Sequence, residues 1–176
     1  MNIIIKIYFK IRLQLAGEHE KASVYHKFLG VNFGNNVRFT GTPDFGSEPY
    51  LVHIGSDVTI TDGVKFHTHD GGVGILRKKY PGVDVFAPII IGDNVFIGSN
   101  STILPGVKIG NNIIIGASSL VTKDLANDGV YGGVPAKLIK TLAEYEEKIK
   151  SEGVYIKGSG EQKKEELLKT FLITKK

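Results

Sequence analysis

The chain has 176 residues, of which 41% are hydrophobic and 23% charged, a composition typical of a folded domain with a core. The absence of cysteine excludes disulfides, thiolate metal sites and a cysteine nucleophile. The net charge of +4 comes mostly from the two ends, and no run of Lys or Arg interleaved with aromatic residues indicates nucleic-acid binding.

Residues 1–15 carry a hydrophobic pattern that fits two structures. Every odd position from Ile3 onward is apolar, which favours a strand, whereas Lys6, Lys10 and Gln14 recur at helical spacing. A bilayer-spanning helix needs about 20 apolar residues, so this charged stretch is not expected to be an integral membrane segment. It also lacks the small-residue cleavage site of a secretory signal, and we therefore expect a cytoplasmic protein.

A short helix is expected next, from Glu18 to Leu29. Ala22 and Tyr25 would lie on its apolar side, and Gly30 follows as a stop signal. The sequence therefore predicts a partly helical N-terminal segment, residues 1–30, ahead of the main fold.

The middle of the chain repeats every six residues, and each clear hexad begins with a β-branched residue. These residues are Ile91, Ile97, Ile103, Ile109, Ile115 and Val121, and glycine follows four of them. The same period runs less regularly from Phe33 to Phe66, with a three-residue change of phase after Phe45. Six residues fit a short strand and a tight turn better than a helix. Three such units close a triangular coil with the β-branched residues inside, and Gly and Asn are expected at its corners for their backbone angles.

The repeat is interrupted by residues 70–88, a predicted loop that leaves the coil directly after His69. Loops carried on a rigid scaffold commonly bind ligands. Asp70, Arg77 and Tyr80 make this loop the expected wall of a substrate site, because they offer charge, hydrogen bonds and an aromatic ring.

After the coil, which is predicted for residues 31–135, we expect a C-terminal helical extension over residues 136–176. Residues 141–144 have the pattern of a capping box, which predicts a helix ending near Gly153. A second helix is expected from about Glu161 to Leu172. Helices of this kind commonly cap the open end of a β-helix.

Three stretches resemble a known family: FHTHDGG ahead of the loop, IIIGDNVFIGSN within the hexads, and GGVPAKLIK after them. Together, over roughly residues 30 to 142, they resemble the hexapeptide-repeat acyltransferases. They are most similar to the O-acetyltransferases that modify capsular polysaccharides and exopolysaccharides, and to the maltose and galactoside acetyltransferases. The resemblance implies a mainly β fold, a left-handed parallel β-helix that assembles as a homotrimer. It also implies acetyl-coenzyme A as donor, no metal, and a sugar hydroxyl of a surface polysaccharide or its precursor as acceptor.

The resemblance assigns roles to individual residues. His69 would be the general base, a task that suits imidazole because it titrates near neutral pH. The backbone N–H of Ser99 would stabilise the oxyanion of the reaction. Asp70, Arg77 and Tyr80 of the inserted loop are expected to bind the acceptor because of their position and chemistry, and not because of the resemblance. The residues expected to bind coenzyme A are Ser99, Gly116, Ala117, Thr122, Lys123, Lys137 and Lys140.

Three alternatives stay open at this point. His53, His67 and His69 lie close in sequence and could bind a metal ion, as in the trimeric carbonic anhydrases of the same fold. The acceptor could instead be an antibiotic or the amine of an amino sugar. The alternative from a different functional class is a non-catalytic β-helix that binds glycan.

Overall fold

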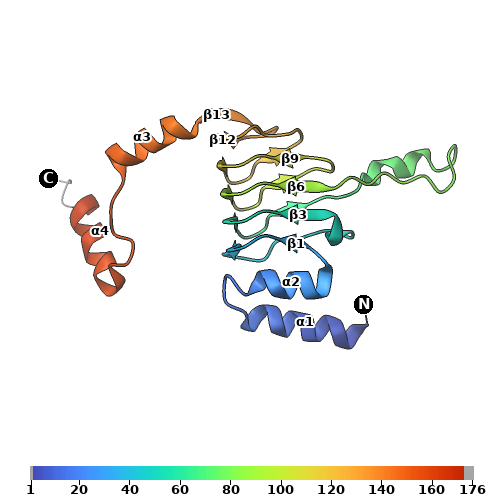
Figure 1. Ribbon diagram of the computed structural model, residues 1–176, viewed down its shortest axis with the longest axis horizontal. Helices are drawn as coiled ribbons and strands as arrows, with labels where there is room; N and C mark the ends of the chain where they lie inside the picture. The colour runs from blue at the N-terminus through green and yellow to red at the C-terminus, as the bar shows by residue number, and fades with distance from the viewer. Residues whose placement is uncertain (1, 173–176) are drawn as a thin grey trace. The chain divides into compact units, whose positions relative to one another are not determined.

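The computed structural model describes residues 2–172 (Figure 1). It divides into two compact units, Met1–Ala143 and Glu144–Lys176. Within the described residues, no helix combines the length and the apolar character needed to cross a membrane.

The first unit is a coil of short strands that visits three sheets in rotation (Figure 1). All strands pair in parallel except β12 and β13, which pair antiparallel after the last turn of the coil. The first sheet contains β1 (Asn32–Phe33), β3 (Val52–Ile54), β6 (Ile89–Ile91) and β9 (Lys108–Ile109). The second contains β2 (Arg38–Phe39), β4 (Thr59–Ile60), β7 (Val95–Ile97), β10 (Ile113–Ile115), β12 (Gly129–Gly132) and β13 (Lys137–Thr141). The third contains β5 (Lys65–Phe66), β8 (Thr102–Ile103) and β11 (Leu120–Val121).

The core is a column of hexad side chains inside this coil, as the six-residue period predicts. Ile97 pairs with Ile115 on the next turn, so equivalent positions of successive turns stack on one another. Burying one such side chain contributes about 2–3 kcal/mol relative to leaving it in water. The six predicted β-branched residues are all 3% exposed or less, namely Ile91, Ile97, Ile103, Ile109, Ile115 and Val121.

The corners of the coil use asparagine and glycine for different reasons. Asparagines at the corners adopt left-handed backbone angles, with φ between 54° and 60°, which asparagine tolerates better than most residues. Gly98 does not need such an angle. A Cβ atom at Gly98 would lie 2.5 Å from the backbone nitrogen of Ala117 on the next turn, so this glycine is required for space. The expectation that glycine serves the corner backbone angles is therefore wrong at Gly98. The asparagines are Asn36, Asn94, Asn100 and Asn112.

Two helices precede the first strand, and the ambiguous stretch at the start of the chain is helical. The Asn2 side chain accepts a hydrogen bond from the Ile4 N–H at 3.1 Å and so caps α1 (Ile3–Leu15). Helix α2 (Lys21–Leu29) ends at Gly30, whose φ of 77° confirms the predicted stop.

Helices α1 and α2 pack on each other and on the first turns of the coil through aromatic rings. The Phe9 ring of α1 lies 6.1 Å from that of Tyr25 in α2. Tyr25 in turn contacts Phe39 and Phe45 of the coil, with ring centroids 5.1 and 5.0 Å apart. These contacts cover the first turn of the hydrophobic column.

The C-terminal part contains the two predicted helices. Helix α3 (Leu142–Glu152) follows β13 directly and begins within the predicted capping pattern, and it ends just before Gly153, near its predicted end. Helix α4 (Lys163–Leu172) follows the short 3₁₀ helix η3 (Gly160–Gln162). Two further 3₁₀ helices, η1 (Pro49–Leu51) and η2 (Gly71–Leu76), lie in the first unit and flank the candidate site.

Candidate active site

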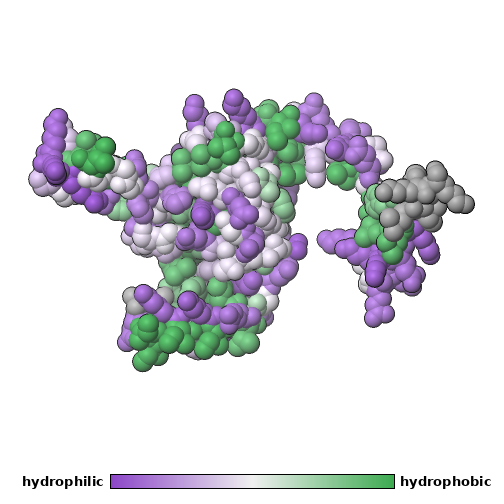
Figure 2. All heavy atoms as spheres, turned by 180° about the vertical axis from the view of Figure 1, so that it is seen from behind, coloured by the Kyte–Doolittle hydropathy of each residue, from purple (hydrophilic) through white to green (hydrophobic). Residues whose placement is uncertain are grey.

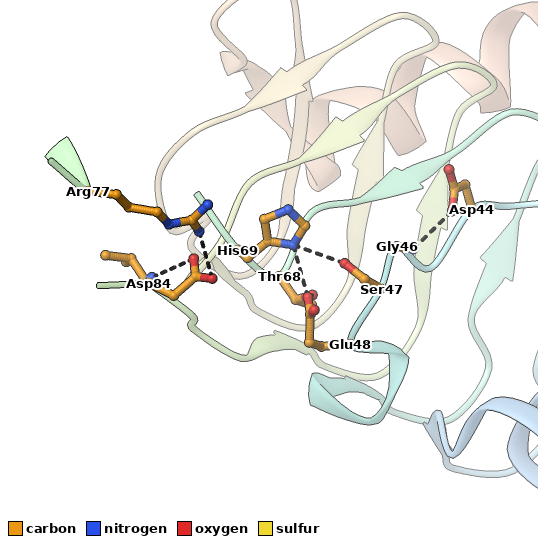
Figure 3. A network of polar contacts seen from close by, with 9 residues as sticks. Asp44, Gly46, Ser47, Glu48, Thr68, His69, Arg77 and Asp84 are labelled. Carbon is orange, nitrogen blue, oxygen red and sulfur yellow. Dashed lines mark hydrogen bonds and ion pairs between the residues drawn. The ribbon is translucent and has the colours of Figure 1, made fainter. Parts of the chain in front are cut away.

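His69 is the centre of a hydrogen-bonded cluster formed by two neighbouring turns of the coil (Figure 3). The Glu48 Oε2 atom lies 2.9 Å from His69 Nδ1, and it also accepts a hydrogen bond from the Thr68 hydroxyl at 3.0 Å. The Ser47 hydroxyl oxygen lies 3.2 Å from the same imidazole nitrogen. Thr68 is fully buried, whereas the side chain of His69 is 36% exposed and that of Glu48 17% exposed. The imidazole therefore has a fixed inner edge and an outer edge that solvent can reach.

The charge state of Glu48 determines which imidazole nitrogen carries the hydrogen. Burial raises the pKa of this carboxyl group, but the hydrogen bonds from His69, Thr68 and Ser47 lower it more, so the pKa falls below its ordinary value. An ionised carboxylate can only accept hydrogen bonds, so Nδ1 of His69 must be the donor. The neutral ring then has its free lone pair on Nε2, which Figure 3 shows pointing away from Glu48.

The strand register explains why residues from separate turns meet here. Asp44 pairs with Lys65, a shift of 21 residues, and the same shift brings Glu48 level with His69. Sequence reasoning did not select Ser47 or Glu48. The signal that could have found them is the three-residue change of phase after Phe45, because the inserted residues carry this turn out toward the position of His69.

An open hollow of about 560 Å³ lies beside the cluster. His67 and His69 leave β5 on the same side, as the spacing of two residues predicts, and both line the hollow. Asp70 also lines it, and its carboxylate accepts a hydrogen bond from the Gly72 N–H at 2.9 Å, which caps η2. Thr122 lies on the same corner of the coil, two turns further along, and also lines the hollow. The remaining lining residues are Val85, Ala87, Leu104 and Pro105.

The inserted loop leaves and rejoins the coil through a short two-stranded neck beside His69. His69 pairs antiparallel with Phe86, and the Asp70 N–H donates to the Val85 carbonyl at 3.0 Å. Beyond this neck the loop extends away from the coil (Figure 1). Arg77 donates to the Asp84 carboxylate at 3.0 Å within the loop, so its guanidinium is engaged (Figure 3).

Tyr80 lies in the same extended part of the loop. Its side chain is 50% exposed, and the Lys79 ammonium lies 5.2 Å from the centre of its ring. Of the three residues expected to bind the acceptor, only Asp70 lines the hollow at His69 in the same chain. Arg77 and Tyr80 are not among its lining residues.

Most of the residues expected to bind coenzyme A lie at one corner of the coil, where the parallel strands of the second sheet end. Ser99 follows β7. The Ser118 N–H, next to Ala117, donates a hydrogen bond to the Ser99 carbonyl at 2.8 Å, so the corners of successive turns stack. Gly116 and Ala117 follow β10 at this corner. Lys137 begins β13 and pairs with Gly132, so it lies at the same corner. His69 lies at a different corner of the coil, which follows the third sheet.

The other three residues of that set are placed elsewhere. Thr122 and Lys123 follow β11 of the third sheet, on the corner of His69. Lys140 pairs with Val130 near the other end of β13, away from the corner that carries Ala117. A single chain therefore brings Thr122 to the hollow of the predicted base, but it does not bring Ser99, Gly116, Ala117 or Lys137 there.

The histidines do not assemble a metal site within residues 2–172. His53 lies on the first sheet, where its Nδ1 atom is 3.3 Å from the Asn32 side-chain amide. No group of three or more His, Cys, Asp or Glu side chains among the described residues is arranged to hold a metal ion. The chemistry that the cluster can perform with its own atoms is proton transfer at His69 Nε2.

Residues 88–123 match the family described as the hexapeptide repeat of succinyl-transferase. The chain is 59% identical over 131 residues to Protein CapG of Staphylococcus aureus, across 73% of this chain and 76% of that protein. It is 38% identical over 114 residues to the galactoside O-acetyltransferase of Escherichia coli strain K12, across 65% of this chain and 53% of that protein. A solved structure of a galactoside acetyltransferase in complex with coenzyme A has a TM-score of 0.59 and 27% identity, over 82% of both chains. The chain therefore belongs to the hexapeptide-repeat acetyltransferase family, and it is an acyltransferase.

Proposed function

We propose that this enzyme transfers an acetyl group from acetyl-coenzyme A to a sugar hydroxyl of a surface polysaccharide or its precursor. The observation that carries the proposal is the ionised Glu48 carboxylate on His69 Nδ1, which leaves Nε2 as a base beside an open hollow. The likeness to a galactoside O-acetyltransferase supports the sugar hydroxyl, and the coenzyme A complex of a similar structure supports the donor. Acetyl-coenzyme A is a cytoplasmic metabolite, so the proposal locates the reaction in the cytoplasm.

The proposed reaction moves one proton and one acyl group. Nε2 of His69 takes the proton from the acceptor hydroxyl as its oxygen attacks the thioester carbonyl carbon. The resulting imidazolium is stabilised by the Glu48 carboxylate. The backbone N–H of Ser99 donates to the oxyanion of the tetrahedral intermediate. When the C–S bond breaks, the proton on Nε2 passes to the leaving sulfur, which yields free coenzyme A and the acetyl ester.

We further propose that the complete site lies between two subunits of a homotrimer. The supporting observation is that His69 and Ala117 occupy different corners of one coil, so one chain alone offers only half of the required groups. A neighbouring chain that presents its Ala117 corner to the His69 hollow would complete the site, with Lys123 and Lys137 available for the phosphates of the nucleotide. The left-handed sense of the coil belongs to the same proposal and follows from the family resemblance.

The test is an assay of the purified full chain with acetyl-coenzyme A and a panel of galactosides, maltose, amino sugars and oligosaccharides. Thiol release reports turnover, and mass spectrometry of the product reports acetylation. We expect turnover with hydroxyl acceptors and an ester that mild base removes. Turnover only with amines, giving a base-stable amide, would replace the proposal with N-acetylation. Glycan binding without thiol release would indicate the non-catalytic alternative.

A further inference from the structure

Helix α1 has two apolar faces, and only one of them is used by the fold. Phe9 and Leu13, one turn apart, are half-buried against α2 and the core. Ile4 and Ile7 are 70% and 54% exposed, and Leu15 at the far end is 78% exposed. At 3.6 residues per turn these three residues lie on the side of the helix opposite Phe9 and Leu13. Ile3 and Ile11 extend the same exposed face, and we refer to these five residues together as the outer face of α1.

The outer face is continuous and lies at one end of the first unit. In Figure 2 hydrophobic atoms gather along the lowest edge of the molecule, at the height of α1, with hydrophilic atoms directly above them. Exposed single apolar residues are common on proteins, but a contiguous stripe along a whole helix marks a surface that binds something.

Basic residues border the outer face on both sides. Lys6 and Lys10 follow one edge of the stripe and Arg12 follows the other, and no acidic residue occurs before Glu18. An apolar face bordered by Lys and Arg is the pattern of helices that lie in the plane of a membrane surface. At 13 residues α1 is about 20 Å long, shorter than the hydrocarbon thickness of a bilayer, so it suits lying on the surface.

We propose that the outer face of α1 docks the enzyme on an anionic lipid bilayer. The isoleucines enter the boundary between headgroups and acyl chains, while Lys6, Lys10 and Arg12 contact lipid phosphates. A second copy of the chain suits the face less well, because it would bring two stretches of like charge together with no carboxylate between them. The inference goes beyond the acetyl transfer and does not depend on the identity of the acceptor.

The test uses the full chain and vesicles of phosphatidylcholine, alone or mixed with phosphatidylglycerol, separated by flotation. We expect binding to the anionic vesicles to be about tenfold or more stronger than to the neutral ones, and to weaken with salt. One variant carries Ile4→Ser, Ile7→Ser and Ile11→Ser, and a second carries Lys6→Gln, Lys10→Gln and Arg12→Gln. Each is expected to lose about tenfold or more of the binding, since both burial and charge contribute.

Control variants carry comparable changes on the second unit. Lys163→Gln, Lys164→Gln and Lys169→Gln remove equal charge from α4, and Val154→Ser with Tyr155→Ser removes exposed apolar side chains. We expect these controls to bind within about twofold of the unchanged protein. Circular dichroism and turnover in solution check that the α1 variants are folded, because α1 contains none of the residues proposed for catalysis.

Two results would overturn the docking proposal. One is equally weak binding of the unchanged protein to both kinds of vesicle. The other is a concentration-dependent larger assembly, seen by light scattering, that the isoleucine variant dissolves while vesicle binding is unaffected. That second result would assign the outer face to another copy of the chain. Neither result bears on acetyl transfer, so the docking proposal and the proposed function fail separately.

Discussion

Glu48 Oε2 lies 2.9 Å from His69 Nδ1, although the two residues belong to separate turns of the coil. The carboxylate holds the imidazole from its inner edge and selects the tautomer with a free Nε2. It would also offer a negative charge to the imidazolium of the proposed proton transfer. The pair therefore supplies both the orientation and the electrostatics that a general base needs.

Replacement of His69 by Asn should lower kcat by about 10²–10⁴-fold, because the group that accepts the hydroxyl proton is lost. The affinity for coenzyme A should stay near normal, since the proposed base acts on the acceptor hydroxyl and not on the donor. The measurement is steady-state turnover together with coenzyme A binding by calorimetry. His67→Asn is the control, because His67 lines the same hollow without the partnership of Glu48. Near-normal turnover in His69→Asn with loss in His67→Asn would transfer the role to His67.

Glu48→Gln should also lower kcat strongly, by about 10²–10⁴-fold if the neutral amide permits the wrong tautomer of His69. The volume of the side chain is almost unchanged, so the KM for acetyl-coenzyme A should move little. Glu48→Asp is the informative companion, because it keeps the charge and shortens the reach to Nδ1. A partial rescue of kcat by Asp over Gln would support an electrostatic role, and equal turnover in all three proteins would contradict it.

The contribution of Glu48 to the free energy of unfolding should decrease as the pH falls. Its pKa in the folded protein is lowered from the ordinary value of 4.5, because the hydrogen bonds it accepts outweigh the effect of burial. The folded state therefore binds fewer protons than the unfolded state near that pH, so the contribution is fully present above pH 4.5 and is lost as the pH falls through the folded pKa. Urea unfolding of the unchanged protein and of Glu48→Gln should give a constant difference at neutral pH that shrinks in acid. A difference that grows in acid would contradict the assignment.

The sequence predicted the features that follow from the six-residue repeat, and it missed those that depend on which residues of neighbouring turns lie side by side. The β-branched hexads predicted the buried column, because every sixth residue must point inward whatever the neighbouring turn does. Glu48 could not be found this way, since its role depends on a shift of 21 residues between turns that only the folded coil defines. The start of the chain was ambiguous because its apolar residues occupy both faces of α1. A pattern with two apolar faces gives no single period.

Tyr25→Phe should stabilise the protein. Tyr25 is 2% exposed, its hydroxyl has no hydrogen-bond partner among the described residues, and burial raises the pKa of that hydroxyl. Phenylalanine keeps the ring contacts with Phe39 and Phe45 and removes a buried polar group, so the free energy of unfolding should rise by about 1 kcal/mol. Urea unfolding measures the change, and Phe39→Ala provides the opposite reference, with an expected loss of about 3–5 kcal/mol. Destabilisation by Tyr25→Phe would mean that the hydroxyl is hydrogen-bonded.

Two inactive variants should restore activity to each other if the site lies between subunits. His69→Ala removes the base, and Ala117→Phe fills the proposed pantetheine groove at the other corner. Co-expressed and purified as mixed trimers, they should recover about one third of the normal activity, because each mixed trimer has one interface in three that pairs an intact His69 with an intact Ala117. Activity is measured on mixed oligomers purified through two different tags. No recovery in such mixed oligomers would mean that each chain carries its own complete site.

The inserted loop contains two groups of residues: some stabilise its conformation, and others have exposed side chains that could contact the proposed acceptor. Arg77 donates to Asp84 and to the Val83 carbonyl, so it belongs to the first group, whereas Tyr80 presents an exposed ring. We expect Tyr80→Ala to raise the KM for the acceptor by about 3–10-fold, because sugars pack on aromatic faces, and to leave the KM for acetyl-coenzyme A unchanged.

Arg77→Gln should behave like Asp84→Asn, because both remove the same exposed ion pair, and either should change the free energy of unfolding by less than about 1 kcal/mol. Steady-state kinetics in both substrates, with unfolding as the second measurement, distinguish the two groups of residues. If Tyr80→Ala instead weakens donor and acceptor equally and shifts the protein to smaller oligomers, the loop stabilises subunit contacts, and its assignment to the acceptor is wrong.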